Sequence, residues 1–338
     1  MRILLIKTSS MGDVIHTLPA LTDAEQAIPG ITFDWVVEEN FLEIPRWHPR
    51  VDKIIPVAWR RWRKQLFAAE TRQQWHGFRS DIREKSYDLI IDAQGLVKSA
   101  MFALVAKGKR AGLDWHSARE SLASLLYQKK CTVNFYQHAV VRMRSLFAEL
   151  LDYPVPDTMA DYGVDRNQFM ERGTESNYLV FLHGTTWATK LWPENYWVEL
   201  AQLAAAQGLQ VKMTAGNAEE VARANRIAAA CANVTVLPKL SIVKVAQLLA
   251  DAKAAVSVDT GFGHLAAALS LPMVSLYGPT NPEFTGAMGK NQTHLAASFS
   301  CAPCLQRQCS YRGAAQATPA CFTTIPPAQV WFFLEKLI

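Results

Sequence analysis

The stretch VSVDTGFGHLAAALSLPMVSLYGPTNP, residues 256–282, contains the signals of two strands and one helix. A short strand-forming run at 256–258 precedes the polar turn Asp-Thr-Gly at 259–261, and an Ala/Leu-rich helix follows from about Gly263. A second apolar run at 273–276 leads into a loop rich in Gly and Pro. Strand, polar turn, helix and strand in this order predict a parallel α/β unit.

The polar turn of this unit is a candidate ligand site. In parallel sheets, ligands bind at the carboxyl ends of strands, beside helix N-termini whose free N–H groups favour anions. Asp259, Thr260, Gly261 and His264 fall at that place. The alternative is that Asp259 and Thr260 only cap the helix. Capping alone does not require the neighbouring glycines and histidine, so we favour a ligand site.

Composition and charge describe a cytoplasmic globular protein. The chain has 338 residues, 50% of them hydrophobic and 19% charged, which is enough for two domains and excludes a disordered chain. The net charge of +5 is modest. No apolar run approaches the ~18 residues of a membrane span, and the first residues form a strand with no signal-peptide pattern. We therefore expect a cytoplasmic location, where cysteines stay reduced.

Strand-like runs alternate with helical patterns along the whole chain, which predicts parallel sheets covered by helices. A segment rich in Pro and Gly, 152–177, separates two such series and is the expected linker. We therefore predict an α/β protein with domains at 1–160 and 175–338. The expected strands are 2–7, 32–37, 53–57, 88–92, 178–183, 209–214, 234–237, 254–258 and 273–276.

The turn after the first strand, residues 8–13, offers a carboxylate at a strand end. Asp13 follows Gly12, which allows a substrate to approach closely, and a helix is expected from Val14 to Ala27. The turn matches neither GxGxxG nor a P-loop, so it does not predict nucleotide binding. The alternative role for Asp13 is that of the N-cap residue of this helix.

The segment Trp59-Arg60-Arg61-Trp62-Arg63-Lys64 carries four cations and two indoles. It could be a solvated helix face, and it is thin evidence for nucleic-acid binding. We favour an anionic lipid headgroup as its ligand, because guanidinium groups bind phosphates and carboxylates in pairs of hydrogen bonds and Trp suits a membrane interface. Further polar residues of the first half, at or near strand ends, are Gln94, Lys98 and Arg119.

The second half carries groups suited to a nucleotide. Thr185, Thr186 and Lys190 lie on the loop after one expected strand and could bind a pyrophosphate. Glu220 follows the next strand, where an acidic residue often binds ribose hydroxyls. We therefore expect a nucleotide-binding second domain and an acceptor-binding first domain, with a cleft between them.

Four cysteines near the C-terminus form a C-x2-C-x4-C-x11-C pattern within about 298–322: Cys301, Cys304, Cys309 and Cys321. Thiolates at such spacing can hold zinc or iron tetrahedrally. Four reduced thiols in a folded loop are the alternative, and a disulfide is less favoured in the cytoplasm. Cys131 and Cys231 resemble ordinary buried residues, and an amphipathic helix at 326–337 closes the chain.

Several motifs in order resemble the lipopolysaccharide heptosyltransferases, in particular those that add the first heptose. They are KTSSMGDVIHTLPAL (7–21), FDWVVEE (33–39), RRWRK (60–64), IDAQGLVKSA (91–100) and SVDTGFGHLAAAL (257–269). The resemblance covers nearly the whole chain and implies the GT-B architecture, two Rossmann-like domains facing across a cleft. Two features depart from the enterobacterial pattern, namely the loop at 187–189, which lacks acidic residues, and the four-cysteine loop.

The resemblance also implies an activity: transfer of L-glycero-D-manno-heptose from ADP-heptose to a Kdo sugar of Kdo-lipid A, with inversion and without a required metal. Asp13 would be the general base. The implied donor-site residues are Thr185, Thr186, Lys190, Glu220, Leu240, Asp259, Thr260, Gly261 and His264. The implied acceptor-site residues are Ser10, Arg60, Arg61, Arg63, Lys64, Gln94, Lys98 and Arg119.

The expected partners are these two substrates and the cytoplasmic face of the inner membrane, with no nucleic acid and no protein partner. Two other readings stay open. One is another ADP-heptose-dependent transferase of the same fold, such as a second-heptose enzyme. The other is a nucleotide-binding protein without turnover.

Overall fold

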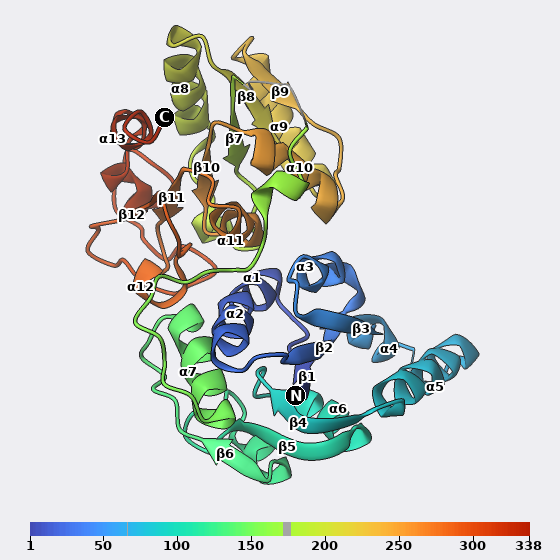
Figure 1. Cartoon of the computed structure of the whole chain (residues 1–338). Helices are drawn as coiled ribbons and strands as arrows, with labels where there is room; N and C mark the ends of the chain where they lie inside the picture. The colour runs from blue at the N-terminus through green and yellow to red at the C-terminus, as the bar shows by residue number, and fades with distance from the viewer. Residues whose placement is uncertain (66, 172–176) are drawn as a thin grey trace. The chain divides into compact units, whose positions relative to one another are not determined.

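The computed structural model describes residues 1–65, 67–171 and 177–338, and the chain divides into two compact units, Met1–Val164 and Asp165–Ile338 (Figure 1). Each unit is built on a six-stranded sheet whose neighbouring strands pair in parallel. The predicted α/β class is therefore confirmed. The division between the units falls inside the segment expected as linker, of which residues 172–176, including Gly173, lie outside the described residues.

The first unit has the strand order β3-β2-β1-β4-β5-β6. Its strands are β1 (Arg2–Ile6), β2 (Thr32–Glu38), β3 (Val51–Val57), β4 (Ser86–Asp92), β5 (Lys107–Leu113) and β6 (Lys129–Cys131). Its helices are α1 (Met11–Ile15), α2 (Leu18–Ala27), η1 (Glu39–Phe41), α3 (Glu43–Arg46), α4 (Trp59–Trp62), α5 (Ala69–Arg83), α6 (Val97–Val105), η2 (Ser121–Leu126) and α7 (Ala139–Leu151), where η marks a 3-10 helix.

The second unit has the strand order β12-β11-β10-β7-β8-β9. Its strands are β7 (Tyr178–Leu182), β8 (Gln210–Met213), β9 (Val234–Val236), β10 (Ala254–Val258), β11 (Met273–Tyr277) and β12 (Gln292–Ala296). Its helices are η3 (Arg166–Gln168), η4 (Ala188–Lys190), α8 (Glu194–Ala206), α9 (Ala218–Ala229), α10 (Ile242–Asp251), α11 (Gly261–Ala268), α12 (Pro282–Thr285), η5 (Ala320–Thr324) and α13 (Pro327–Leu334).

The prediction of one continuous helix over Val14–Ala27 is wrong. The structure divides it into α1 and α2, with His16 capping the first and Thr17 preceding the second. Pro19 lies in the first turn of α2, where its missing N–H costs nothing. β5 has no counterpart among the expected strands, because its sequence KGKRAGL has three cations and two glycines in place of an apolar period.

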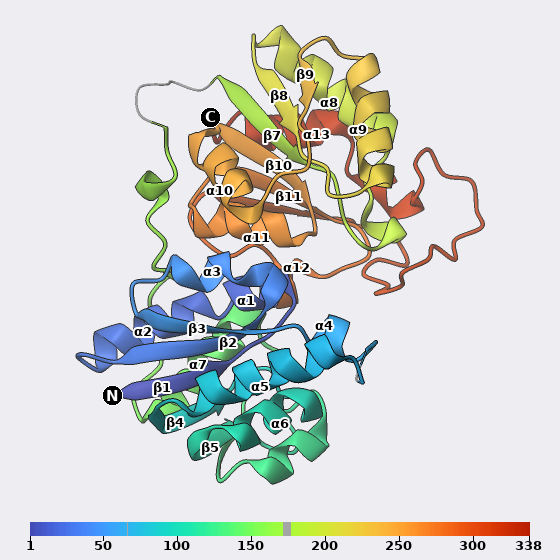
Figure 2. The ribbon, with the colours of Figure 1, turned by 90° about the vertical axis from the view of Figure 1, so that its right-hand side faces the viewer.

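Helices cover both faces of the first sheet (Figure 2). Leu4 and Ile6 of β1 pack with Phe78 of α5 and Phe102 of α6 in one core cluster. On the other face, Phe33 of β2 contacts Phe147 of α7, with ring centroids 6.1 Å apart. Because successive side chains of a strand alternate between faces, an almost uniformly apolar strand such as β1 is what a sheet buried on both sides requires.

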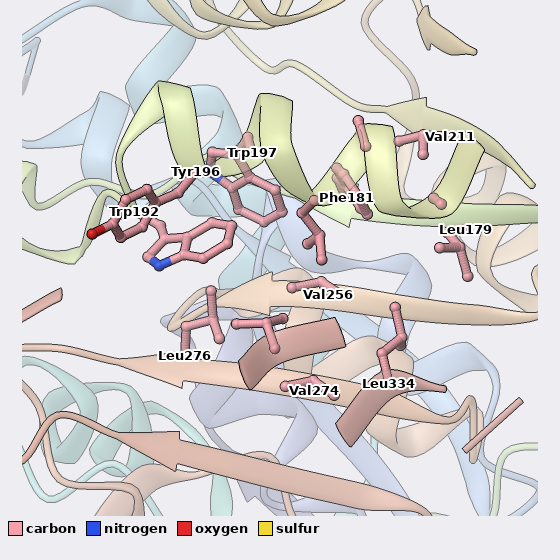
Figure 3. Close-up of a cluster of buried hydrophobic side chains, with 14 of the residues drawn as sticks. Leu179, Phe181, Trp192, Tyr196, Trp197, Val211, Val256, Val274, Leu276 and Leu334 are labelled. Atoms are coloured by element: carbon pink, nitrogen blue, oxygen red, sulfur yellow. The ribbon is translucent and has the colours of Figure 1, made fainter. Parts of the chain in front are cut away.

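The second unit has an aromatic core between α8 and the sheet (Figure 3). The indoles of Trp192 and Trp197 lie edge to face with ring centroids 5.0 Å apart, and Phe181 of β7 lies 4.9 Å from Trp197. Leu334 of α13 joins the same cluster, so the closing helix is part of this core. Within the described residues, no helix combines the length and the apolar character needed to cross a bilayer.

Candidate active site

The Asp13 turn lies at the centre of the first sheet's carboxyl edge. β1 and β4 are neighbours in register, with Ile6 opposite Asp92, so the turns that follow them meet at this edge. Asp13 Oδ2 accepts hydrogen bonds from the backbone N–H of Ser10 at 2.7 Å and from its hydroxyl at 2.8 Å. Ser10 is the N-cap of α1 and Asp13 lies at N3, so the two form a capping box, and Asp13 is not itself the N-cap residue of the alternative.

Two cations near Asp13 were missed in the sequence. Lys7 is buried and donates from Nζ to the carbonyl of Ala93 at 2.9 Å. Burial lowers the pKa of Lys7, and the carboxylates of Asp13 and Asp92 oppose that shift. Burial likewise lowers the pKa of Arg142, again opposed by Asp13. Lys7 and Arg142 are therefore two cations that interact electrostatically with the Asp13 carboxylate.

Gln94 and Asp92 hold the same turn in place. Gln94 Oε1 accepts from the backbone N–H groups of Thr8 and Ser9 at 3.0 and 3.2 Å. Asp92 accepts from the N–H of Gln94 and from the hydroxyl of Tyr127, the latter at 2.6 Å. Burial raises the pKa of Asp92. The structure thus gives Gln94, expected in acceptor binding, a positioning role for the turn that carries Ser10.

The cations of the RRWRK segment differ in their surroundings. Arg61 pairs with Glu39 at 2.9 Å and with Glu70 at 3.1 Å. Arg60, Arg63 and Lys64 are exposed, and none forms an ion pair with another described residue. The three exposed side chains are therefore the ones available to an external anion, and Arg61 is largely satisfied within the protein.

Glu38 connects this segment to Lys98. Its buried carboxylate accepts from the backbone N–H of Arg60 at 3.0 Å. Burial raises the pKa of Glu38, against the opposing effects of Arg60 and Lys98. Burial lowers the pKa of Lys98, and the nearby charges of Arg60 and Arg63 lower it further. Two of the predicted acceptor cations, Arg60 and Lys98, therefore lie near one buried carboxylate.

The expected membrane role of the two indoles in this segment is wrong for Trp62. Its side chain is buried, its Nε1 donates to Gln74 at 2.7 Å, and its ring lies edge to face against Trp75. Trp59 is half-buried and its ring contacts Phe102. These rings anchor α4 on the core, and Arg60 between them is exposed to solvent.

In the second unit, the turn after β10 meets the loop after β7, because these strands are neighbours. Lys190 Nζ lies 2.7 Å from Asp259 Oδ2, with both side chains mostly buried. The hydroxyl of Thr280 donates to the same oxygen at 2.8 Å, and that of Thr185 donates to the Asp259 carbonyl at 3.2 Å. Asp259 therefore organises both loops.

The alternative role of Asp259 and Thr260, which was only to cap a helix, does not agree with the structure. Thr260 occupies the N-cap position of α11 without a side-chain capping bond, and Asp259 binds Lys190 instead. A Cβ on Gly263 would lie 2.7 Å from Ser257 Oγ, so a glycine is needed for α11 to approach β10. α11 begins at Gly261, directly after the turn that follows β10, so its first N–H groups lie at the strand-end edge, although that of Gly263 donates to the carbonyl of Thr260 at 3.0 Å.

Glu220 lies beside the same loops. Its Oε2 accepts from the N–H of Gly216 at 2.6 Å, and a Cβ on Gly184 would lie 2.7 Å from its carboxyl carbon. The Glu220 carboxylate is therefore packed against the backbone that leads to Thr185. For three other predicted donor-site residues the structure gives the exposure. Thr186 is exposed, Leu240 is half-buried before α10, and His264 is buried in α11.

Trp187 lies on the loop after β7 and was given no role from the sequence. In the structure, two cations lie over its ring. Lys190 Nζ is 4.5 Å and Arg307 Cζ 5.2 Å from its centroid. Thr189 donates to the carbonyl of Gln306 at 2.6 Å, which joins this loop to the cysteine-rich segment. The only sequence signal for this arrangement is the proximity of Trp187 to Lys190 in the chain.

The four C-terminal cysteines line one cavity of about 30 Å³, while Cys131 and Cys231 are buried separately as expected. Burial raises the pKa of Cys321 to about 11, and the other three thiols of the group add to the shift. In the part of the chain that the structure describes, no three His, Cys, Asp or Glu side chains are arranged to hold a metal ion.

The comparison with known proteins identifies the family. Residues 75–315 match the model of glycosyltransferase family 9 (heptosyltransferase). Lipopolysaccharide heptosyltransferase 1 of Pseudomonas aeruginosa is 53% identical over 348 aligned positions, covering 100% of this chain and 98% of that protein. The chain belongs to glycosyltransferase family 9. The predicted family and glycosyltransferase activity are thereby confirmed.

Two solved heptosyltransferase structures are similar to the whole chain. The Escherichia coli heptosyltransferase WaaC with ADP has a TM-score of 0.89 and is 46% identical, with full coverage of both chains. WaaC with ADP-2-deoxy-2-fluoro heptose has a TM-score of 0.85 at the same identity and coverage. The predicted GT-B architecture is confirmed by this agreement.

Proposed function

We propose that the chain transfers L-glycero-D-manno-heptose from ADP-heptose to the Kdo residue of the lipopolysaccharide inner core, with Kdo-lipid A as acceptor. The observation that carries the proposal is the Lys190–Asp259 pair, which joins two strand-end loops beside Glu220 and the start of α11. Supporting it, the similar WaaC structures hold ADP and a fluorinated ADP-heptose. Mass spectrometry of a mixture of the enzyme, ADP-heptose and Kdo-lipid A tests it through the mass of one added heptose.

In this proposal the second unit binds the donor. Lys190 neutralises the diphosphate together with the hydroxyls of Thr185 and Thr186, and the N–H groups at the start of α11, at Gly261, donate to it. Glu220 binds the ribose hydroxyls. Leu240 and His264 line the space for the adenosine and heptose, next to Thr260.

Asp13 is the proposed general base. It takes the proton from the attacking Kdo hydroxyl as that oxygen bonds to the anomeric carbon and the bond to ADP breaks, which inverts the configuration. Ser10 holds Oδ2 and so fixes the orientation of the carboxylate. Positive charge develops on the sugar and negative charge on the departing diphosphate, which Lys190 stabilises. No metal is required for this step.

The exposed cations of the first unit are the proposed acceptor site. Arg60 and Lys98 lie near Glu38, Arg63 lies near Lys98, and Lys64 follows Arg63 in the chain. These cations would bind carboxylates or phosphates of the acceptor, with the backbone of Arg119 close to Gly95 on the same edge. Since the acceptor is a lipid, we also propose that the protein works at the cytoplasmic face of the inner membrane.

Neutralising Arg60, Arg63 and Lys64 together to Ala should raise the acceptor KM and leave ADP affinity unchanged. Basic residues near an anionic bilayer contribute roughly 1 kcal/mol each, and salt screens that attraction. The wild-type KM should therefore rise with added salt, and that of the triple variant should rise less. Steady-state kinetics at several salt concentrations provides the measurement. Parallel salt curves of equal height for the two proteins would eliminate the acceptor site.

Arg61→Ala is the matched control for this experiment. It removes a cation from the same helix, but one that Glu39 and Glu70 already pair. We expect the acceptor KM to change less than after loss of Arg60 alone. An equal or larger effect of Arg61→Ala would place the acceptor's anion on Arg61 and contradict the distinction drawn from the ion pairs.

For the cysteine segment we propose a structural zinc or iron ion. The support is that Cys301, Cys304, Cys309 and Cys321 all line one small cavity. Thiolates are preferred ligands of both metals, and tetrahedral binding would require the four sulfur atoms to draw together around the ion.

Purified protein should contain about one bound metal ion per chain, as expected for a four-thiolate site. Cys301→Ser with Cys304→Ser should lose it, whereas Cys131→Ser with Cys231→Ser should keep it. Elemental analysis by mass spectrometry distinguishes these outcomes. Metal-free wild-type protein with four reactive thiols would support the alternative of reduced cysteines.

A further inference from the structure

Large apolar side chains are exposed on α6 and on the neighbouring η2. Met101 and Leu104 of α6 are 53% and 47% exposed, and Leu122 and Leu125 of η2 are 60% and 64% exposed. The two members of each pair are three positions apart in the chain, which places them on one side of their helix. Four such residues on two adjoining short helices are more than the scattered single apolar residues of an ordinary surface.

The two helices are in direct contact. Ala100 of α6 packs with Ala123 and Tyr127 in a small core cluster of its own. At their beginnings, Glu120 Oε2 accepts from the N–H of Val97 at 2.7 Å. The exposed apolar residues of α6 and η2 therefore flank one contact and form one surface, the α6–η2 patch. Figure 2 shows α6 at the surface of the first unit, next to α5 and β5.

Cations border the α6–η2 patch. Lys98 lies in the first turn of α6, Arg119 precedes η2 by two residues, and Lys107 and Lys109 follow the end of α6. Lys107 and Lys109 are exposed, and neither forms an ion pair with another described residue. The segment that joins β5 to η2 has two acidic residues, and both are engaged within the protein. Glu120 accepts from the backbone N–H of Val97, and Asp114 accepts from the N–H of Ser117 and the hydroxyl of Thr132. An apolar centre with a basic border is complementary to an anionic bilayer surface.

We propose that the α6–η2 patch docks the first unit on an anionic lipid bilayer, with its apolar side chains in the interfacial region and its lysines on the headgroups. The proposal rests on the proposed function, in which the acceptor is a membrane lipid and Lys98 and Arg119 bind its anionic part. A bilayer suits the patch better than a second copy of the chain. In a twofold dimer, the same patch on both copies would bring the two basic borders together, and they would repel.

Leu122→Ser with Leu125→Ser tests the docking. These residues are exposed and touch the fold little, so the variant should stay folded. We expect its partition onto phosphatidylcholine vesicles containing phosphatidylglycerol to fall at least about tenfold, because two apolar anchors are lost. Lys107→Gln with Lys109→Gln should weaken binding less and flatten its dependence on phosphatidylglycerol content. Vesicle flotation measures both.

Val155→Ser with Met159→Ser is the matched control. These side chains are 48% and 60% exposed on the segment after α7. That segment binds Arg144 of α7, and α7 packs on the opposite face of the sheet. The control should bind vesicles as the wild type does. Equal vesicle binding by the wild type and the Leu122/Leu125 variant would overturn the proposal.

Two further measurements distinguish membrane docking from dimer formation and from the proposed heptose transfer. If sedimentation finds a dimer that Leu122→Ser with Leu125→Ser dissolves, a second copy covers the patch and the proposal is wrong. Turnover of a water-soluble Kdo acceptor should be unchanged in that variant, while turnover of Kdo-lipid A in vesicles falls. Loss of vesicle binding with no heptose transfer by any form would support the docking surface and overturn the proposed function alone.

Discussion

Asp13→Asn should lose most heptose transfer, with kcat lower by about 10²–10⁴-fold, the usual contribution of a general base. The amide keeps the size of the side chain and an oxygen that can still accept from Ser10, so the capping interaction is largely retained. What it loses is the ability to take a proton. Steady-state kinetics with saturating ADP-heptose and acceptor gives the rate.

Two controls separate catalysis from folding in this variant. ADP affinity should be unchanged, since the proposed donor residues belong to the second unit. The unfolding temperature should fall by no more than a few degrees, because a lost cap costs typically ~1 kcal/mol. If Asp13→Asn kept more than about a tenth of the wild-type rate, Asp13 would be a capping residue and not the base.

Much of the fold could be predicted because both sheets are buried on two sides. Strands such as Tyr178–Leu182 and Ala254–Val258 are fully buried, and their continuous apolar runs are visible in the sequence. β5 is different. It joins the sheet by pairing with β4 and β6. Because residues Lys107 to Lys109 are exposed, the strand has no local apolar pattern from which it could be predicted.

The sequence could predict where the candidate site residues lie in the fold, but not which hydrogen bonds and ion pairs they form. Strand ends and polar turns indicated Asp13, Lys190 and Asp259, because parallel strands bring their carboxyl ends to one edge. Which cation meets which carboxylate depends on contacts between distant segments. Arg61 forms its ion pairs with Glu39 and Glu70, and only the fold reveals that pairing.

The same limit explains the missed residues. Lys7 directly follows the apolar strand β1, and Arg142 lies on a helix 129 residues after Asp13. Lys7 opens the motif at 7–21, but nothing in that motif assigns it a role, and Arg142 lies in none of the quoted motifs. Their relation to Asp13 comes from the arrangement of β1, the following turn and α7.

Lys190→Ala should weaken ADP and ADP-heptose binding by roughly 10- to 150-fold, since a hydrogen bond to a charged group is worth about 1.5–3 kcal/mol. The Lys190 ammonium is held by Asp259 and lies over the ring of Trp187. Its position is therefore fixed by contacts within the protein, and its loss also leaves the Asp259 carboxylate to repel the phosphates. Calorimetry with ADP and with adenosine measures the effect.

The comparison of the two ligands decides what Lys190 binds. Adenosine lacks the phosphates, so its affinity should be little changed by Lys190→Ala, whereas Glu220→Gln should weaken ADP and adenosine alike through the ribose. Lys253→Ala is the matched control, because Lys253 is exposed and directly precedes β10, at the opposite end of that strand from Asp259. Its ADP affinity should equal that of the wild type. Unchanged ADP affinity in Lys190→Ala would mean that the Lys190–Asp259 pair only stabilises the loops, and the diphosphate would then have to be bound by the hydroxyls and the N–H groups of α11.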